Sequence, residues 1–209
     1  EEVYGMHNMP GLAAATFSIR EGALMAASDK FTIDIEGAGG HAAMPHNTID
    51  PVAIAAHVVT ALQSIVSRNV NPARAAVVSV TSIHAGDAFN VIPRTVKMLG
   101  TARSLDEPVR DLLEARIGQV AQGIAASFGA RATYVYDRGY PTTVNARRET
   151  AYAASIAREI VGDDRVNDNA DPSMGGEDFS FMLNARPGAF IFLGNGSSGE
   201  RHADDYDFN

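Results

Sequence analysis

The feature that most constrains the fold is a regular alternation of strand and helix patterns between residues 29 and 138. It begins at residues 31–35, where apolar and polar side chains alternate with the period of two that is typical of a half-buried strand. Residues 52–68 then repeat apolar side chains at helical spacing. An Asp-Pro pair precedes them, and these two residue types favour the cap and the first position of a helix. The segment therefore predicts a strand followed by an amphipathic helix.

The same alternation continues through the second half of this region. Residues 75–85 are rich in β-branched side chains and predict a strand, and residues 95–104 predict the next one. The Asp-Glu-Pro sequence at 106–108 starts a second apolar-periodic helix that ends near Gly129, and residues 131–137 predict a last strand. The order β-α-β-β-α-β predicts a ferredoxin-like domain, in which both helices cover one face of an antiparallel four-stranded sheet.

The sequence on either side of this domain has a different character. Residues 149–161 predict a helix, and residues 189–193 form a continuous apolar run that is typical of a strand buried on both faces of a parallel sheet. We therefore expect residues 1–28 and 139–209 to be two segments of one α/β domain, into which residues 29–138 are inserted.

Charge and composition exclude several classes of partner. The formal net charge is −8, so the chain has no basic surplus with which to bind nucleic acid. The apolar runs are too short or too polar to span a bilayer, and we expect no membrane partner. The chain has no cysteine, which excludes disulfides and thiolate metal sites within these residues. It starts without a methionine, and we expect it to be part of a longer, cytoplasmic protein.

A glycine-rich loop at residues 37–46 carries the first candidate catalytic residue, His41. Glycines precede this histidine, and glycine lets a ligand or another chain approach the backbone closely. Because the loop follows a predicted strand, it is well placed to present an imidazole ring. A flexible turn with an incidental histidine is the alternative interpretation. His46, in the same loop, has no assigned role.

Two further histidines, His7 and His202, lie at the ends of predicted strands in the α/β domain. Ligands gather at the carboxyl ends of the strands in such sheets, so two neutral imidazoles there could share a divalent metal. Each histidine could equally be a hydrogen-bonded surface residue. Glu177 and Asp178 precede a short predicted helix, where carboxylates either stabilise the helix dipole or contribute to a site.

Asn90 and Arg103 flank a predicted strand of the inserted domain. A guanidinium group can bind a carboxylate through two parallel hydrogen bonds, so Arg103 is a candidate substrate-binding residue. A surface arginine in a strand is the alternative interpretation.

Taken together and in order, these motifs resemble those of one enzyme family. The motifs are Gly-Gly-His41-Ala-Ala-Met-Pro-His, Asn90-Val-Ile-Pro, Arg103, Glu177-Asp-Phe, Pro187-Gly-Ala-Phe-Ile-Phe-Leu-Gly and His202. Essentially the whole chain is similar to the dinuclear metallo-amidohydrolases, which include hippurate hydrolases, auxin-conjugate hydrolases and aminoacylase-like carboxypeptidases. The resemblance implies that a metal-activated water hydrolyses the amide bond of an N-acyl amino acid. It also implies a metallopeptidase-type catalytic domain and two divalent ions, which would be zinc, manganese, cobalt or nickel.

The resemblance further implies a role for each candidate residue. His7 and His202 match metal ligands. His41 matches a histidine that polarises the scissile carbonyl or stabilises the oxyanion, often from the other subunit of a dimer. Asn90 and Arg103 match residues that hold the carboxylate end of the substrate. The inserted domain would then be a lid and dimerisation domain, and we expect a homodimer.

Two parts of the family pattern are absent. The first metal motif, a cysteine or histidine followed by His-Asp, does not occur, and neither does the Glu-Glu pair that supplies the general base. Glu1-Glu2 lies too close to His7 to be that pair. The chain therefore resembles the C-terminal half of such an enzyme, and we expect residues 1–209 alone to be inactive. The alternative is a non-catalytic ferredoxin-like module for dimerisation or small-ligand binding, because fold alone does not settle function.

Overall fold

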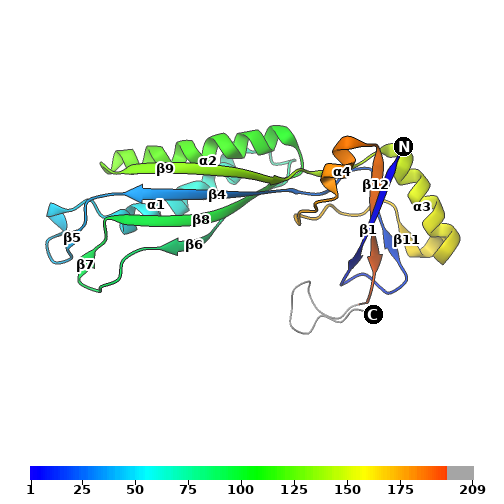
Figure 1. The fold of residues 1–209 in the computed structure, drawn as a ribbon, viewed down its shortest axis with the longest axis horizontal. Helices are drawn as coiled ribbons and strands as arrows, with labels where there is room; N and C mark the ends of the chain where they lie inside the picture. The colour runs from blue at the N-terminus through cyan, green and yellow to red at the C-terminus, as the bar shows by residue number, and fades with distance from the viewer. Residues whose placement is uncertain (197–209) are drawn as a thin grey trace. The chain divides into compact units, whose positions relative to one another are not determined.

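The computed structural model describes residues 1–196, which belong to two compact units (Figure 1). Residues 27–139 form one of them, which we call the inserted unit. Of the described residues, 1–26 and 140–196 form the other, which we call the flanking unit. The sequence placed these boundaries at 28/29 and 138/139.

The inserted unit is built around one four-stranded sheet. Its strands lie in the order β6-β8-β4-β9, and β8 pairs antiparallel with both β4 and β6. The chain order of strands and helices is the predicted one, and the elements are β4 (Ala27–Glu36), α1 (Pro51–Ser64), β6 (Ala76–His84), β8 (Thr95–Ser104), α2 (Glu107–Ser127) and β9 (Arg131–Tyr140). Both helices contact β4 and β8, so the two central strands carry the helical layer.

The alternation in β4 explains how the core of the inserted unit forms. Phe31, Ile33 and Ile35 are buried beneath the helices, while polar residues between them face the other side of the sheet. The predicted cap is present, because the Asp50 carboxylate accepts hydrogen bonds from the backbone N–H groups of the first turn of α1. A π-helical turn (Ile65–Asn69) extends α1. Together they are long and apolar enough to cross a membrane by composition, but Ile54, Val58 and Leu62 are buried in this core.

Short elements form one end of the inserted unit. β5 (Gly40–His41) pairs antiparallel with β7 (Val91–Ile92), and a 3-10 turn (Pro45–Asn47) follows β5. The glycine-rich loop is therefore held by backbone hydrogen bonds, which a simple flexible turn would lack.

The flanking unit contains a mixed sheet with the strand order β1-β12-β2-β11. β1 and β12 are parallel, and β12 is antiparallel to β2. A separate two-stranded sheet joins β3 and β10. The elements are β1 (Val3–Met9), β2 (Phe17–Ser18), β3 (Gly22–Met25), β10 (Thr143–Asn145), α3 (Arg147–Val161), a 3-10 turn (Asp163–Arg165), β11 (Val166–Asn167), α4 (Ser180–Ala185) and β12 (Gly188–Gly194).

β12 is buried on both faces, as its continuous apolar run predicted. Phe190 and Phe192 pack with Leu24 on one face, and Ala189 packs with Ala154 of α3 on the other. β1 lies next to β12 and forms one edge of the described sheet.

Candidate functional site

His7 lies near the carboxyl end of β1, and its side chain is on the same face of the strand as the Cα hydrogen that Gly5 has in place of a side chain. The Nδ1 atom of His7 lies 2.6 Å from the backbone oxygen of Asn8. A carbonyl oxygen can only accept a hydrogen bond, so Nδ1 carries the proton. In the neutral ring the lone pair is therefore on Nε2. This is the arrangement that a histidine needs to ligate a metal through Nε2.

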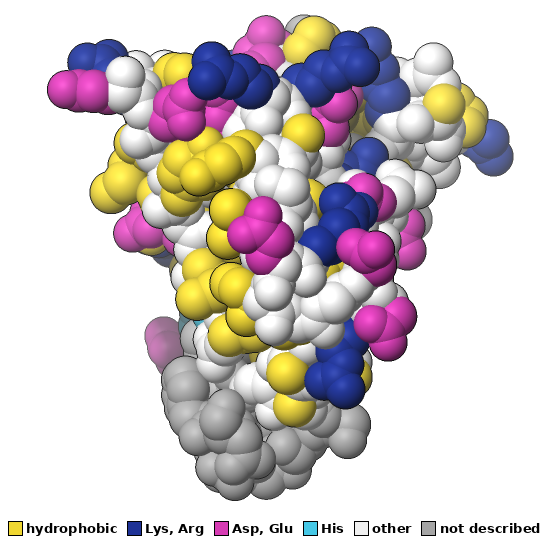
Figure 2. All heavy atoms as spheres, turned by 90° about the vertical axis from the view of Figure 1, so that its right-hand side faces the viewer, with side chains coloured by type: hydrophobic (Ala, Val, Ile, Leu, Met, Phe, Trp, Pro, Cys, Tyr) yellow, Lys and Arg dark blue, Asp and Glu magenta, His cyan; other side chains and the backbone are white. Residues whose placement is uncertain are grey.

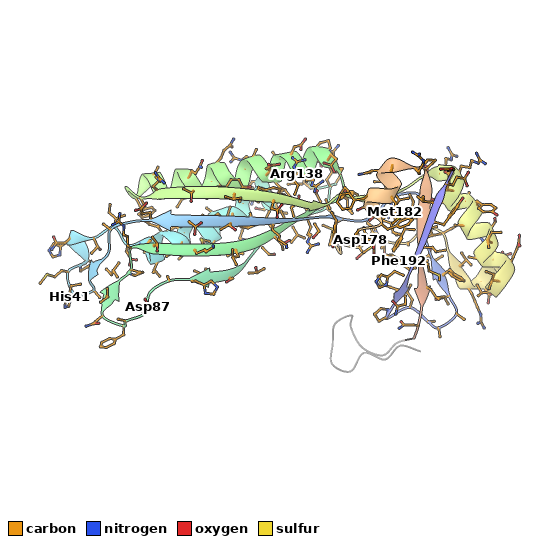
Figure 3. All side chains as sticks on the ribbon, in the orientation of Figure 1. His41, Asp87, Arg138, Asp178, Met182 and Phe192 are labelled. Atoms are coloured by element: carbon orange, nitrogen blue, oxygen red, sulfur yellow. The ribbon has the colours of Figure 1, made fainter. Side chains whose placement is uncertain are left out.

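The segment before α4 packs over the same face of β1. A Cβ atom at Gly5 would lie 3.0 Å from the ring of Phe179 and 2.8 Å from that of Phe190, so the glycine makes room for these rings. Figure 3 labels Asp178, which directly precedes Phe179 in the chain. Glu177 and Asp178 are thereby brought to the face of the strand that carries His7.

The surroundings of Glu177 raise the pKa of its carboxyl group. Burial raises the pKa of its carboxyl group, whereas the hydrogen bond from the Phe179 backbone N–H lowers it. Neighbouring Asp178 raises the pKa further, and the positive charge of a protonated His7 lowers it. The structure thus brings Glu177 within electrostatic range of His7, although the two residues are 170 positions apart in the sequence.

This corner of the flanking unit supplies donors of the kind that zinc and similar ions take, namely an imidazole nitrogen and carboxylate oxygens. Within residues 1–196, however, no three His, Asp or Glu side chains converge as a complete metal site. The second predicted ligand, His202, lies outside the described residues. The described residues around His7 therefore supply some of the ligands of a metal site, but not a complete set.

His41 is held in the opposite tautomer. Its Nδ1 atom accepts a hydrogen bond of 3.1 Å from the backbone N–H of Ala43, so the proton of the neutral ring is on Nε2. The side chain is exposed at the end of the inserted unit that carries β5 and β7, where Figure 3 also labels Asp87. A neutral imidazole of this kind presents an N–H donor, which suits the stabilisation of a developing oxyanion.

Asn90 lies beside the His41 segment. The backbone oxygen of Asn90 accepts a hydrogen bond of 3.0 Å from Ala42, and His41 pairs with Val91 in the β5–β7 ladder. The structure therefore brings together two residues that the sequence had placed in separate motifs. His46 is exposed in the 3-10 turn of the same segment.

Arg103 lies at the other end of the inserted unit. It pairs across the sheet with Ser28, whereas Thr95, which follows the Asn90 segment, pairs with Glu36. At about 3.3 Å per residue, the ends of β8 are roughly 30 Å apart. One copy of the inserted unit therefore cannot place Asn90 and Arg103 on the same small carboxylate. Within the described residues, Arg103 has no carboxylate partner, so its guanidinium remains available.

Comparisons with known proteins match essentially the whole chain to one enzyme family. The sequence matches the family described as Peptidase family M20/M25/M40 over residues 1–209. It is 40% identical to the N-acetylcysteine deacetylase of Bacillus subtilis over 202 residues, which cover 96% of this chain and 52% of the relative. It is 37% identical to the hippurate hydrolase of Campylobacter jejuni over 207 residues, which cover 99% of this chain and 54% of the relative.

A solved structure shows the same similarity in three dimensions. The Bacillus subtilis YXEP protein, described as a dinuclear metal binding peptidase from the M20 family, superposes with a TM-score of 0.80 at 31% identity. The superposition covers 100% of this chain and 52% of that one. The chain thus spans about half the length of the relatives that it matches.

Proposed function

The chain belongs to peptidase family M20/M25/M40, and on this basis we propose that the protein containing it hydrolyses the amide bond of N-acyl amino acids. The names of two relatives, hippurate hydrolase and N-acetylcysteine deacetylase, support this substrate class. The structural observation that carries the proposal is the pair of opposite histidine tautomers. The backbone leaves the lone pair of His7 on Nε2 and the proton of His41 on Nε2.

We propose that His7 ligates a divalent metal through Nε2 and that His202 is a second ligand. The family and its dinuclear relative support two ions, for which zinc, manganese, cobalt and nickel are the candidates. Held by these histidines, a divalent ion would supply Lewis acidity, which would lower the pKa of a bound water toward neutrality. Because the described residues supply only part of a ligand set, residues 1–209 alone should be inactive.

His41 would act on the scissile carbonyl. Its Nε2–H donates to the oxygen on which negative charge develops, and the Ala43 N–H already holds the ring in the required tautomer. The ring therefore needs no proton rearrangement before the reaction. This distinguishes His41 from His7, whose lone pair at the corresponding nitrogen suits a metal.

The inserted unit would serve as a ferredoxin-like lid and as a dimerisation domain. Its strand order β6-β8-β4-β9 and its two helices packed on the central strands support the ferredoxin-like description. The separation of Asn90 from Arg103 supports a dimer in which two copies complete one site. His41 and Asn90 would come from one copy and Arg103 from the other. Arg103 would then bind the substrate carboxylate through a two-pronged ion pair.

The test uses the longer protein that contains this chain. We would measure its divalent metal content and its hydrolysis of hippurate and of N-acetyl amino acids. His41→Ala should reduce turnover by about 100-fold or more and leave the metal content unchanged, because it removes one oxyanion donor. His7→Ala should reduce the metal content, and His46→Ala is the matched control in the same loop.

Three outcomes would contradict the proposal. If the longer protein binds no divalent metal and cleaves no N-acyl amino acid, the inserted unit is better explained as a non-catalytic module. Loss of metal in His41→Ala would make that residue a ligand. Equal effects of His41→Ala and His46→Ala would remove the special role of the His41 ring.

A further inference from the structure

Three large apolar side chains are exposed at the end of the inserted unit that carries His41. Phe89 is fully exposed, and Met44 and Val91 are 53% and 51% exposed. Single exposed apolar residues are common on protein surfaces, but a group of them often marks a surface that binds an apolar ligand or partner. Backbone contacts place all three beside His41 or Asn90, the two candidate residues at this end.

Phe89 and Asn90 are the two central residues of one turn. The turn is closed by a hydrogen bond of 3.4 Å from the Val91 N–H to the Ala88 oxygen. The backbone oxygen of Asn90 also accepts the hydrogen bond from Ala42, which follows His41 in the chain. Phe89 is therefore next to the segment that carries the His41 ring, and the described residues leave its own ring uncovered.

The other two apolar side chains are held next to His41 itself. His41 and Val91 are directly opposite each other in the antiparallel β5–β7 ladder. Opposite residues project their side chains to the same face of a ladder, with Cβ atoms roughly 5 Å apart, so the Val91 side chain lies beside the His41 side chain. The Met44 N–H donates a hydrogen bond of 2.8 Å to the His41 backbone oxygen, so Met44 closes the turn that follows His41.

Exposed apolar residues of the flanking unit provide a contrast. Its helix α3 buries Ala154 and Ala157 against the sheet and leaves Ile156 and Ile160 exposed on another side. Figure 2, which views the side where α3 lies in Figure 1, shows hydrophobic side chains gathered on this face. No candidate residue belongs to α3, whereas each apolar side chain of the His41 end is within three residues of a candidate residue. The apolar group at the His41 end is therefore the one that is placed to contact a substrate.

We propose that Phe89 packs against the apolar part of the acyl group of the substrate and thereby sets the acyl preference of the enzyme. Val91 and Met44 would complete this apolar surface. The inference rests on the proposed function, in which the Nε2–H of His41 donates to the oxygen of the scissile carbonyl. The acyl group is attached to the same carbonyl carbon, so it begins next to the His41 ring.

The two sides of the scissile bond need different surroundings. The nitrogen side leads to the carboxylate of the amino acid, for which the polar groups of Asn90 and Arg103 are proposed. The acyl side carries no charge in hippurate or in an N-acetyl amino acid, and it is best placed against apolar side chains. The exposed residues beside His41 are apolar, and they therefore fit the acyl side.

An aromatic acyl group should gain the most from Phe89. Two rings in contact bury a large apolar area and favour an offset or edge-to-face geometry, whereas an acetyl methyl group covers little of the ring. Hippurate and N-acetylglycine share the same amino acid, so a difference between them isolates the acyl group. We expect Phe89→Ala to lower kcat/KM by about 10-fold or more for hippurate and by less than about twofold for N-acetylglycine.

The kinetic constants separate this role from that of His41. A hydrophobic contact away from the reacting atoms is present both before and in the transition state, so its loss raises KM and leaves kcat nearly unchanged. Loss of an oxyanion donor, as in His41→Ala, instead lowers kcat. Phe89→Ala should therefore act on the KM for hippurate.

The experiment uses the longer protein that contains this chain. Steady-state kinetics would be measured with hippurate, N-acetylglycine and N-acetylphenylalanine, together with metal content, Tm and dimer formation. Phe89→Leu keeps an apolar side chain and removes the ring, so it should show the same order of effects at a smaller size. Phe128→Ala is the matched control, because Phe128 is a partly exposed phenylalanine at the end of α2 that stacks on His57. It should leave the ratio of kcat/KM for hippurate and N-acetylglycine unchanged.

Several results would overturn the inference. Equal losses for hippurate and N-acetylglycine in Phe89→Ala, with wild-type activity toward both, would reject the acyl contact and leave the proposed function intact. A loss confined to N-acetylphenylalanine would assign Phe89 to the amino-acid side chain. Dissociation of a dimer in Phe89→Ala would assign the ring to a contact with the partner copy. A wild-type enzyme that cleaves N-acetylglycine but not hippurate would exclude a site for an aromatic acyl group, and one that cleaves no N-acyl amino acid would reject the proposed function as well.

Discussion

The two units differ in how completely they bury their own apolar residues. In the inserted unit, one continuous core runs beneath α1 and α2, and Phe31, Leu113 and Ile117 are buried at its centre. Among its described residues, the flanking unit buries two small clusters and leaves Met6 and Ile160 exposed. The hydrophobic effect scales with the area removed from water, so the core of the inserted unit stabilises it without apolar residues from elsewhere. The flanking unit leaves an apolar face exposed in this structure.

The largest effect that this comparison predicts is a difference in independent folding. Residues 27–139 expressed alone should unfold in one cooperative transition, because their core is contributed by this segment. The two ends of this segment are held together, because the backbone N–H of Gly139 donates a hydrogen bond of 3.0 Å to the carboxylate of Asp29. Urea unfolding followed by circular dichroism measures the transition.

The matched control joins residues 1–26 to residues 140–209 through a short linker. We expect this chain to unfold without a clear cooperative transition or to associate through its apolar face. A cooperative, monomeric flanking unit would break the comparison, and so would an excised inserted unit with no transition.

The next largest effect concerns a buried ion pair in the inserted unit. The Asp29 carboxylate accepts hydrogen bonds from Nε and Nη2 of Arg110 at 2.8 and 2.6 Å, and one from the Tyr136 hydroxyl at 2.8 Å. Asp29 raises the pKa of Arg110, and burial raises that of Tyr136. Asp29→Asn leaves the buried arginine with only the exposed carboxylate of Glu107, 3.1 Å away, as a countercharge. We expect it to lower the free energy of unfolding by about 3–5 kcal/mol, measured by urea denaturation.

A loss of this size in the excised inserted unit as well as in the longer protein would show that the pair acts within one unit. Asp111→Asn is the control, because Asp111 pairs with Arg138 on the surface. A loss that appears only in the longer protein would contradict a self-contained inserted unit.

The smallest expected effect concerns a second carboxylate–arginine pair, which is exposed and not buried. Glu36 pairs with Arg94 at 2.8 Å, but both side chains are exposed. The hydrogen bond from Arg94 lowers the pKa of Glu36, so any stabilisation is present above the ordinary glutamate pKa and is lost as the pH falls through the lowered value. At pH 7 we expect Glu36→Gln to leave the urea midpoint unchanged within error. A loss comparable to that of Asp29→Asn would show that exposure does not decide the strength of these pairs.

Much of the inserted unit was predictable from local patterns. The alternation at residues 31–35 and the helical repeat after Asp50 each depend on neighbours in the chain, and both appear where expected. The β5–β7 pairing was not predicted, because a two-residue strand carries too short a pattern to distinguish from a loop.

The candidate site was predictable in its residue types and not in its arrangement. His7 and His41 were identified from motifs, but nothing in the sequence indicates that their rings have opposite tautomers. Each tautomer depends on which backbone atom meets Nδ1, and that requires coordinates. Asn90 and Arg103 were expected at one carboxylate, yet the length of β8 separates them.

The sequence by itself predicted the order of the longer strands and helices in the inserted unit and identified the candidate residues, because these follow from short-range periodicity and motif spacing. Only the tertiary structure decided that Glu177 lies near His7, that Arg103 and Asn90 occupy opposite ends of one sheet, and that α3 has a second apolar side left uncovered. These three features depend on contacts between residues far apart in the chain. Local patterns cannot specify such contacts, because the same amphipathic segment can pack against more than one partner.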